Sequence, residues 1–81
     1  MARRVRLTSG ERIRFRRKCY GWSLERLARA TGLSVSALSR LERDEQPVRE
    51  REIQAIADAL GESLADFYRD DPSAMKREAA G

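Results

Sequence analysis

The sequence predicts a small all-α protein, a compact five-helix bundle, and three observations support this. Apolar residues recur at helical spacings of three and four, as in Leu24, Leu27 and Ala28. Hydroxyl residues and glycines mark the starts and ends of the apolar segments. No segment shows the strict alternation typical of a strand. With 81 residues, the chain is long enough for one small domain.

The first helix is expected to run from the Thr8 cap to about Cys19. Thr8 and Glu11 have the spacing of a capping box, in which a hydroxyl and a carboxylate three residues later satisfy each other's backbone N–H groups. Ile13 and Phe15 are its apolar candidates. Its remaining surface is unusually basic, with Arg12, Arg14, Arg16, Arg17 and Lys18.

Two short helices follow. Ser23 is the cap of the second helix, and Gly32 ends it. Ser34 is the cap of the third helix, which covers about residues 34–43 and turns Leu38 and Leu41 inward.

The fourth helix is expected over about Arg49–Leu60, with Gly61 ending it. Its apolar stripe consists of Ile53, Ile56, Ala57 and Leu60. Ser63 begins a short fifth helix. The sequence therefore divides into a basic arm (1–7), a helical domain (8–68) and a polar tail (69–81), which we expect to fray.

Charge is unevenly distributed along the chain. Residues 1–40 carry 11 basic and 2 acidic side chains, whereas residues 41–81 carry 6 and 11. This asymmetry favours a polyanionic partner for the first half, and the alternative is an ordinary solvated charged surface.

The composition excludes several classes of function. There is no histidine and only one cysteine, Cys19, so neither a zinc site of several thiolates nor histidine-based catalysis is available. We expect no enzyme, no metal and no cofactor. No apolar run approaches the roughly 20 residues of a membrane span, so we expect a cytoplasmic protein without a membrane partner.

The segment "LARATGLSVSALSRLE" has the properties of two short helices that meet at a sharp angle. A small residue, Ala28, allows the helices to cross closely, and Gly32 takes the positive φ of the turn. The residues left exposed on the third helix have mostly short side chains, with two arginines. They are Val35, Ser36, Ser39, Arg40 and Arg43. Such a face is slim enough to enter a major groove.

Together, "GERIRFRRK", "GWSLERLARATGLSVSALSRLE" and "IQAIADALGESLADF" resemble the helix-turn-helix domain of the phage repressor and Cro family, also called the xenobiotic-response-element family. The resemblance covers about residues 9–68. It implies a DNA-binding transcription regulator that binds double-stranded DNA as a homodimer on a pseudo-palindromic operator, with residues 34–43 in the major groove.

The resemblance also implies roles for individual residues. An ion pair between Arg17 and Glu42 is expected to clamp the first helix to the third. The candidate base contacts are Val35, Ser36, Ser39 and Arg40. The candidate phosphate contacts are Ser23, Leu24, Ser34, Arg43 and Arg49. The candidate dimer contacts are Leu64, Phe67 and Tyr68.

Some of these roles have alternatives. Arg40 matches the two acceptors of guanine, a contact that discriminates by about 1–3 kcal/mol, but it could instead touch phosphate or water. Leu64 and Phe67 could complete the core of the monomer. Trp22 is expected in the core rather than as a stacking platform. The arm, with Arg3, Arg4 and Arg6, could reach a minor groove or be disordered.

Two positions depart from the family pattern. Leu24 stands where many members have glutamine. Asp44 and Glu45 follow "LER", where a glycine is common. Asp44 tolerates the left-handed conformation, but two acids near the expected phosphate track oppose DNA binding.

Other classes of function remain open from the sequence. The chain could be an antitoxin or another protein-interaction module of the same fold, with the tail folding on a toxin. An activator could use the acidic second half to contact RNA polymerase. RNA binding is disfavoured because no aromatic residues are arranged for base stacking.

Overall fold

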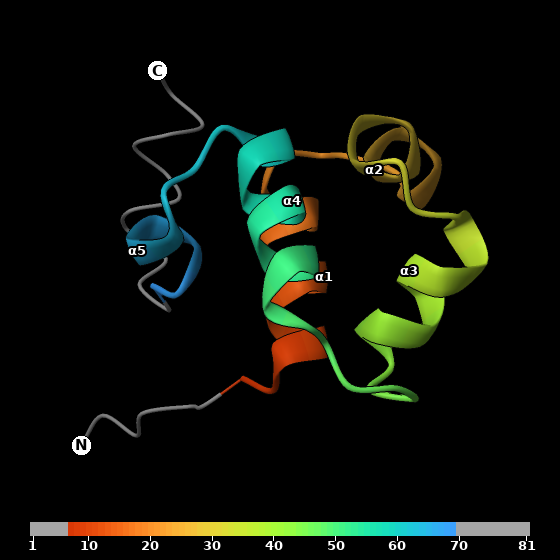
Figure 1. The fold of residues 1–81 in the computed structure, drawn as a ribbon. Coiled ribbons are helices and arrows are strands. Elements are labelled where there is room, and N and C mark those ends of the chain that lie inside the picture. Colours follow the sequence, from red (N-terminus) through yellow and green to blue (C-terminus); the bar gives the residue numbers. More distant parts are fainter. Residues whose placement is uncertain (1–6, 70–81) are drawn as a thin grey trace.

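The computed structural model describes residues 7–69, which form a bundle of five helices without a strand in that range. They are α1 (Ser9–Cys19), α2 (Leu24–Thr31), α3 (Val35–Glu42), α4 (Glu50–Leu60) and α5 (Leu64–Phe67) (Figure 1). The predicted all-α fold is confirmed. Residues 1–6, with Arg3, Arg4 and Arg6, lie outside the described residues, as does the tail from residue 70 onwards.

Four of the five helices begin at a hydroxyl cap. The side chains of Thr8, Ser23, Ser34 and Ser63 each accept a hydrogen bond from the backbone N–H three residues later. Helix α4 begins one residue later than expected, because Arg49 is its cap; the Arg49 N–H donates to Oε1 of Glu52 at 2.8 Å. Local side-chain chemistry thus sets the starts of the helices.

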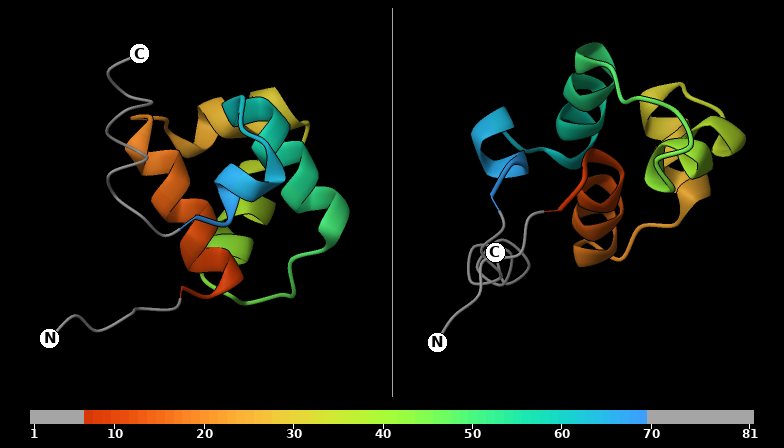
Figure 2. Two further views of the ribbon diagram at one scale, coloured as in Figure 1. Left: turned by 90° about the vertical axis from the view of Figure 1, so that its left-hand side faces the viewer. Right: turned by 90° about the horizontal axis from the view of Figure 1, so that it is seen from below.

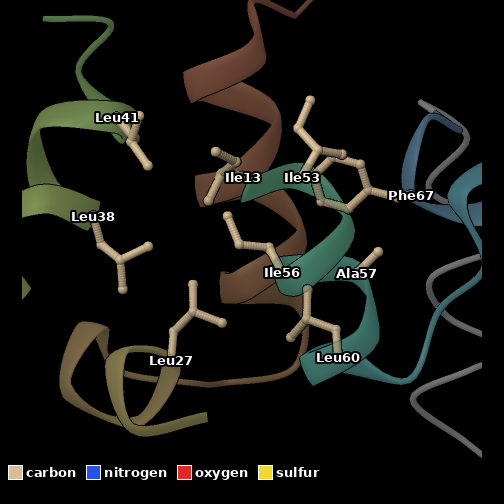
Figure 3. Close-up of a cluster of buried hydrophobic side chains, with 9 residues drawn as sticks. All are labelled: Ile13, Leu27, Leu38, Leu41, Ile53, Ile56, Ala57, Leu60 and Phe67. Atoms are coloured by element: carbon tan, nitrogen blue, oxygen red, sulfur yellow. The ribbon is translucent and has the colours of Figure 1, made fainter. Parts of the chain in front are cut away.

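Every helix contributes to one core (Figure 3). Its nine buried apolar residues are Ile13, Leu27, Leu38, Leu41, Ile53, Ile56, Ala57, Leu60 and Phe67. Burial of such side chains is the main stabilising contribution, at about 1.5–3 kcal/mol for each large one. Trp22 is half-buried and packs against this core, as expected.

Helices α1 and α4 lie side by side in the middle of the bundle, with α2 and α3 on one side and α5 on the other (Figure 1). The right-hand view in Figure 2 shows the same separation of α3 from α5. Since α3 packs against α1 and α2 only with its inner face, its outer face is left at the edge of the molecule.

Phe67 belongs to the core, with only 1% of its surface exposed. This corrects its expected role as a dimer contact, because a side chain already buried within the protomer has no surface to offer a partner. Leu64 is half-buried and packs against the core, whereas Tyr68 is 49% exposed.

The basic residues of α1 do not form one solvated face. Arg12, Arg16 and Arg17 are buried, and Arg14 and Lys18 are exposed. Phe15, by contrast, is only half-buried. The sequence predicted a basic face on this helix and an ion pair for Arg17, but it did not predict the burial of Arg12 and Arg16.

Acidic residues from the second half of the chain form ion pairs with buried arginines of α1. Arg16 and Glu62 form a buried ion pair, with 3.0 Å between Nε and Oε1 and a second contact between Nη2 and Oε2. The hydroxyl of Tyr20 donates to the same carboxylate at 2.6 Å. Folding thus neutralises part of the charge asymmetry read from the sequence.

No helix within residues 7–69 is both long enough and apolar enough to cross a bilayer. Over the same residues, no cluster of three or more metal-ligating side chains occurs.

Candidate nucleic-acid interface

A tight turn joins α2 to α3. Gly32 adopts φ 81°, and its N–H donates to the carbonyl of Ala28 at 2.9 Å. No atom lies within 4 Å of the place where a Cβ would stand, so the backbone conformation, not lack of space, favours glycine. Thr31 fixes the turn further by donating to the carbonyl of Leu27 and accepting from the N–H of Leu33.

The inner and outer faces of α3 differ as its sequence predicts. Leu38 and Leu41 are fully buried on the inner face. On the outer face Val35 is 37% exposed, and Ser36 and Arg40 are exposed as well. The helix therefore presents short side chains and a cation to solvent.

A shallow hollow of about 490 Å³ lies over this outer face. The residues that line it are Leu24, Val35, Ser36, Ser39, Arg40, Arg43 and Glu45. It unites all four candidate base contacts with two candidate phosphate contacts. Ser23, Ser34 and Arg49 do not line it.

A second hollow, of about 280 Å³, involves residues of α1, α2 and α3. Arg14 lines it together with Leu24, Ser39 and Arg43. Arg14 was not among the residues expected from the sequence, because on a helix with five cations no local signal separates the exposed ones from the buried ones.

Polar contacts already link several of these side chains. Arg43 donates to both carboxylate oxygens of Glu45, at 2.8 and 3.2 Å, and to the hydroxyl of Ser39 at 2.9 Å. Arg40 donates from Nε to Oε1 of Gln46 at 3.1 Å. The hydrogen bonds from Arg43 hold the pKa of Glu45 below its usual value, so this carboxylate is ionised at neutral pH.

The two serines expected to bind phosphate act as helix caps. Oγ of Ser23 accepts from the N–H of Arg26, and Oγ of Ser34 accepts from the N–H of Ala37, both at 3.0 Å. Each hydroxyl still has a proton to donate. The arrangement is suited to an anion that approaches the N-terminus of either helix.

Arg17 and Glu42 join α1 to the end of α3. Two hydrogen bonds run from Nε and Nη2 of Arg17 to the carboxylate, at 2.7 and 2.8 Å, and both side chains are more than 90% buried. Nη1 of Arg17 also donates to the carbonyl of Trp22 at 2.8 Å. The hydrogen bond to Glu42 raises the pKa of Arg17 above its usual value.

Asp44 is not a free acid at the rim of this face. Its carboxylate accepts from the hydroxyl of Thr8 at 2.6 Å and from the N–H of Gly10 at 3.0 Å. It adopts the left-handed conformation expected from the sequence, with φ 57°. Of the two acids expected to oppose DNA, Asp44 is engaged with the N-terminus of α1, and Glu45 lines the hollow over α3.

The candidate dimer residue Tyr68 lies at the opposite side of the bundle. Its ring packs edge-on against Phe67, with 5.6 Å between centroids. The guanidinium of Arg12 lies 5.4 Å from the ring centroid and donates to the Tyr68 carbonyl at 3.1 Å. Tyr68 is thus held in place while half of its surface faces solvent.

Comparison with known proteins agrees with this geometry. A helix-turn-helix family model matches residues 13–67, more than half of the chain. The matched range begins at the core residue Ile13 and ends at the core residue Phe67. No curated protein matches the sequence.

Proposed function

Because the chain belongs to the helix-turn-helix family of the Cro/C1 type, a family of DNA-binding transcription regulators, we propose that it binds a specific operator with α3 in the major groove. The observation that carries this proposal is the outer face of α3, on which short side chains surround Arg40 in one open hollow. A major groove about 12 Å wide admits a helix that carries such side chains.

The contacts divide into two kinds. We assign Val35, Ser36, Ser39 and Arg40 to base edges, since all four line the hollow over α3. The guanidinium of Arg40 fits guanine O6 and N7, and Val35 fits a thymine methyl group. Phosphates are assigned to Ser23, Leu24, Ser34, Arg43 and Arg49. They would fix the position of α3 without reading sequence.

A domain of this size covers few base pairs, so we propose a homodimer that reads two half-sites about 34 Å apart. Tyr68, with Leu64 beside it, is the proposed contact. Since α5 and α3 lie on opposite sides of α1 and α4 (Figure 1), the twofold axis must run roughly along the direction from α5 to α3. Only then do both α3 faces point toward the same duplex.

Selection of bound duplexes from a random pool tests the function directly. We expect a pseudo-palindrome with its half-sites one helical turn apart. Arg40→Ala should relax the base preference at one position in each half-site, with a loss of about 1–3 kcal/mol of discrimination against the wrong base. Arg29→Ala, which removes an exposed arginine of α2 outside the hollow, should leave the selected sequence unchanged.

Two outcomes would contradict the assignments. A uniform loss of affinity for all sequences in Arg40→Ala would move Arg40 from base to phosphate. Contacts with phosphates are strong at low salt, and a protein that makes 6–10 of them loses about 10³–10⁵ in affinity when salt rises from 50 to 200 mM. Absence of any binding at 50 mM salt would therefore refute the DNA function. The fold would then be better explained as a protein-interaction module.

The dimer has a separate test. Sedimentation of the full chain at high micromolar concentration, with and without the selected duplex, should show two protomers per operator. Tyr68→Ala should weaken pairing and should leave binding to a single half-site unchanged. A monomer under both conditions would refute the dimer.

A further inference from the structure

Glu45 accepts two hydrogen bonds from Arg43, and both residues line the hollow over α3. Nε and Nη2 of Arg43 each donate to one oxygen of the carboxylate, at 2.8 and 3.2 Å. The remaining terminal nitrogen, Nη1, donates to Ser39 at 2.9 Å. All three guanidinium nitrogens therefore have acceptors within the protein.

The two-point contact has the geometry by which arginine binds a phosphate. Guanidinium binds carboxylate and phosphate through the same pair of parallel N–H···O bonds. Arg43 cannot direct that pair of donors to Glu45 and to a DNA phosphate at the same time. A duplex that takes the same pair of donors, Nε and Nη2, must first displace the carboxylate.

Exposure makes this exchange feasible. The side chains of Arg43 and Glu45 are 59% and 49% exposed, and water screens the attraction between exposed charges, so such pairs contribute little to stability. The contrast with Arg17 and Glu42 is clear, since that pair is more than 90% buried. Arg43 and Glu45 form a contact that a strong ligand can open.

We propose that Glu45 is an internal competitor of the DNA backbone: its carboxylate holds Arg43 where a phosphate would be held, and so weakens binding to any duplex, whatever its sequence. The inference rests on the proposed DNA function. Its consequence is that one unit of negative charge at the end of α3 limits how many phosphates the face can neutralise. The competition does not change the contact between Arg40 and the bases.

The central variant is Glu45→Gln, which keeps the size of the side chain and removes its charge. We expect affinity for a random duplex to rise about two- to fivefold, the range that corresponds to an exposed pair. Where the carboxylate keeps Arg43 away from the phosphate in the wild type, Glu45→Gln frees up to one phosphate contact, which steepens the slope of log K against log salt by up to about 0.9. Between 50 and 200 mM salt, the variant should therefore lose up to about 3.5-fold more affinity than the wild type.

Two further variants separate competition from a general effect of charge. Asp58→Asn removes one negative charge from an exposed residue of α4 that bonds Gln54, and it should change affinity far less. In an Arg43→Gln background, Glu45→Gln should give no gain, because there is no longer an arginine to release. Thermal melting should be almost unchanged in all of these, since each site is exposed.

The outcomes are distinct. An equal gain with and without Arg43, or with Asp58→Asn, would show simple charge repulsion and would overturn the competition. No gain, or a loss, in Glu45→Gln would overturn it too. If the wild type binds duplex and only the predicted gain is missing, this inference fails and the DNA function stands. If neither the wild type nor Glu45→Gln binds at 50 mM salt, both fail.

Discussion

Asp44 accepts a hydrogen bond from the backbone N–H of Gly10, with 3.0 Å between Oδ1 and N. This contact fastens the loop after α3 to the N-terminus of α1, where unpaired N–H groups and the helix dipole favour a carboxylate. The approach is very close, because a Cβ on Gly10 would stand 2.2 Å from the carbonyl oxygen of Leu41. The end of the proposed recognition helix is therefore positioned by α1.

Gly10→Ala should destabilise the fold by about 1–3 kcal/mol, the usual range for overpacking. The added methyl group meets a backbone carbonyl as well as the Asp44 carboxylate, at 2.7 Å from Oδ1. The Asp44 side chain can rotate away from the methyl group, but the backbone carbonyl cannot. Urea unfolding of the full chain measures the loss.

Gly32→Ala is the matched comparison. Gly32 has φ 81° and free space around it, so alanine there should cost about 1–2 kcal/mol through backbone strain alone. Asparagine, which tolerates this conformation, should recover part of the loss at position 32 and none at position 10. Recovery at position 10 would show that crowding is not the cause there.

Replacements of Asp44 should separate its carboxylate from its backbone conformation. Asp44→Ala loses both hydrogen bonds and places alanine at φ 57°. We expect it to lower the free energy of unfolding by about 1–3 kcal/mol. Asp44→Gly removes only the carboxylate contribution, and Asp44→Asn keeps the acceptor for Gly10. The free energy of unfolding is expected to fall in the order Asp, Asn, Gly, Ala at position 44. If Ala is as stable as Asp, the contact with α1 is not stabilising.

Removal of Glu42 should be costly because it leaves the charge of Arg17 in a largely buried place. We expect Glu42→Ala to lower the free energy of unfolding by about 3 kcal/mol. The double variant Arg17→Met with Glu42→Leu should recover most of this loss, since an apolar pair of similar volume often replaces a buried ion pair at little cost. Equal losses in the single and double variants would refute the clamp.

Glu62→Gln should destabilise the fold by about 3–5 kcal/mol, because it removes the anion from the buried pair with Arg16. Tyr20→Phe removes one hydrogen bond to the same carboxylate, and it should lower the free energy of unfolding by about 1.5–3 kcal/mol. Arg14→Ala and Lys18→Ala alter exposed cations of the same helix and should stay within about 0.5 kcal/mol. A loss in Arg14→Ala as large as the loss in Glu62→Gln would contradict the burial pattern of α1.

Local signals in the sequence predicted the order and most of the ends of the helices. Ser23, Ser34 and Gly32 act within three or four residues of themselves, through cap hydrogen bonds and a positive φ, so their neighbours suffice to interpret them. The inward face of α3 was equally readable, because Leu38 and Leu41 follow the helical period. The outer face then follows by elimination.

Charge could not be read in the same way. The sequence shows five cations on α1 and cannot say that Arg16 meets Glu62, 46 positions later, or that Asp44 turns to Gly10. It also gives no sign that Glu45 binds Arg43 over the proposed reading face.

By itself, then, the sequence determined the five helices, the turn at Gly32 and the slim outer face of α3. Tertiary structure alone decided which cations of α1 remain exposed: Arg14 stays at the surface, whereas Arg16 is buried against Glu62 and Arg17 against Glu42. The physical reason is range. Caps and helical periodicity depend on bonds between near neighbours, whereas the partner of a long charged side chain depends on which helices pack together.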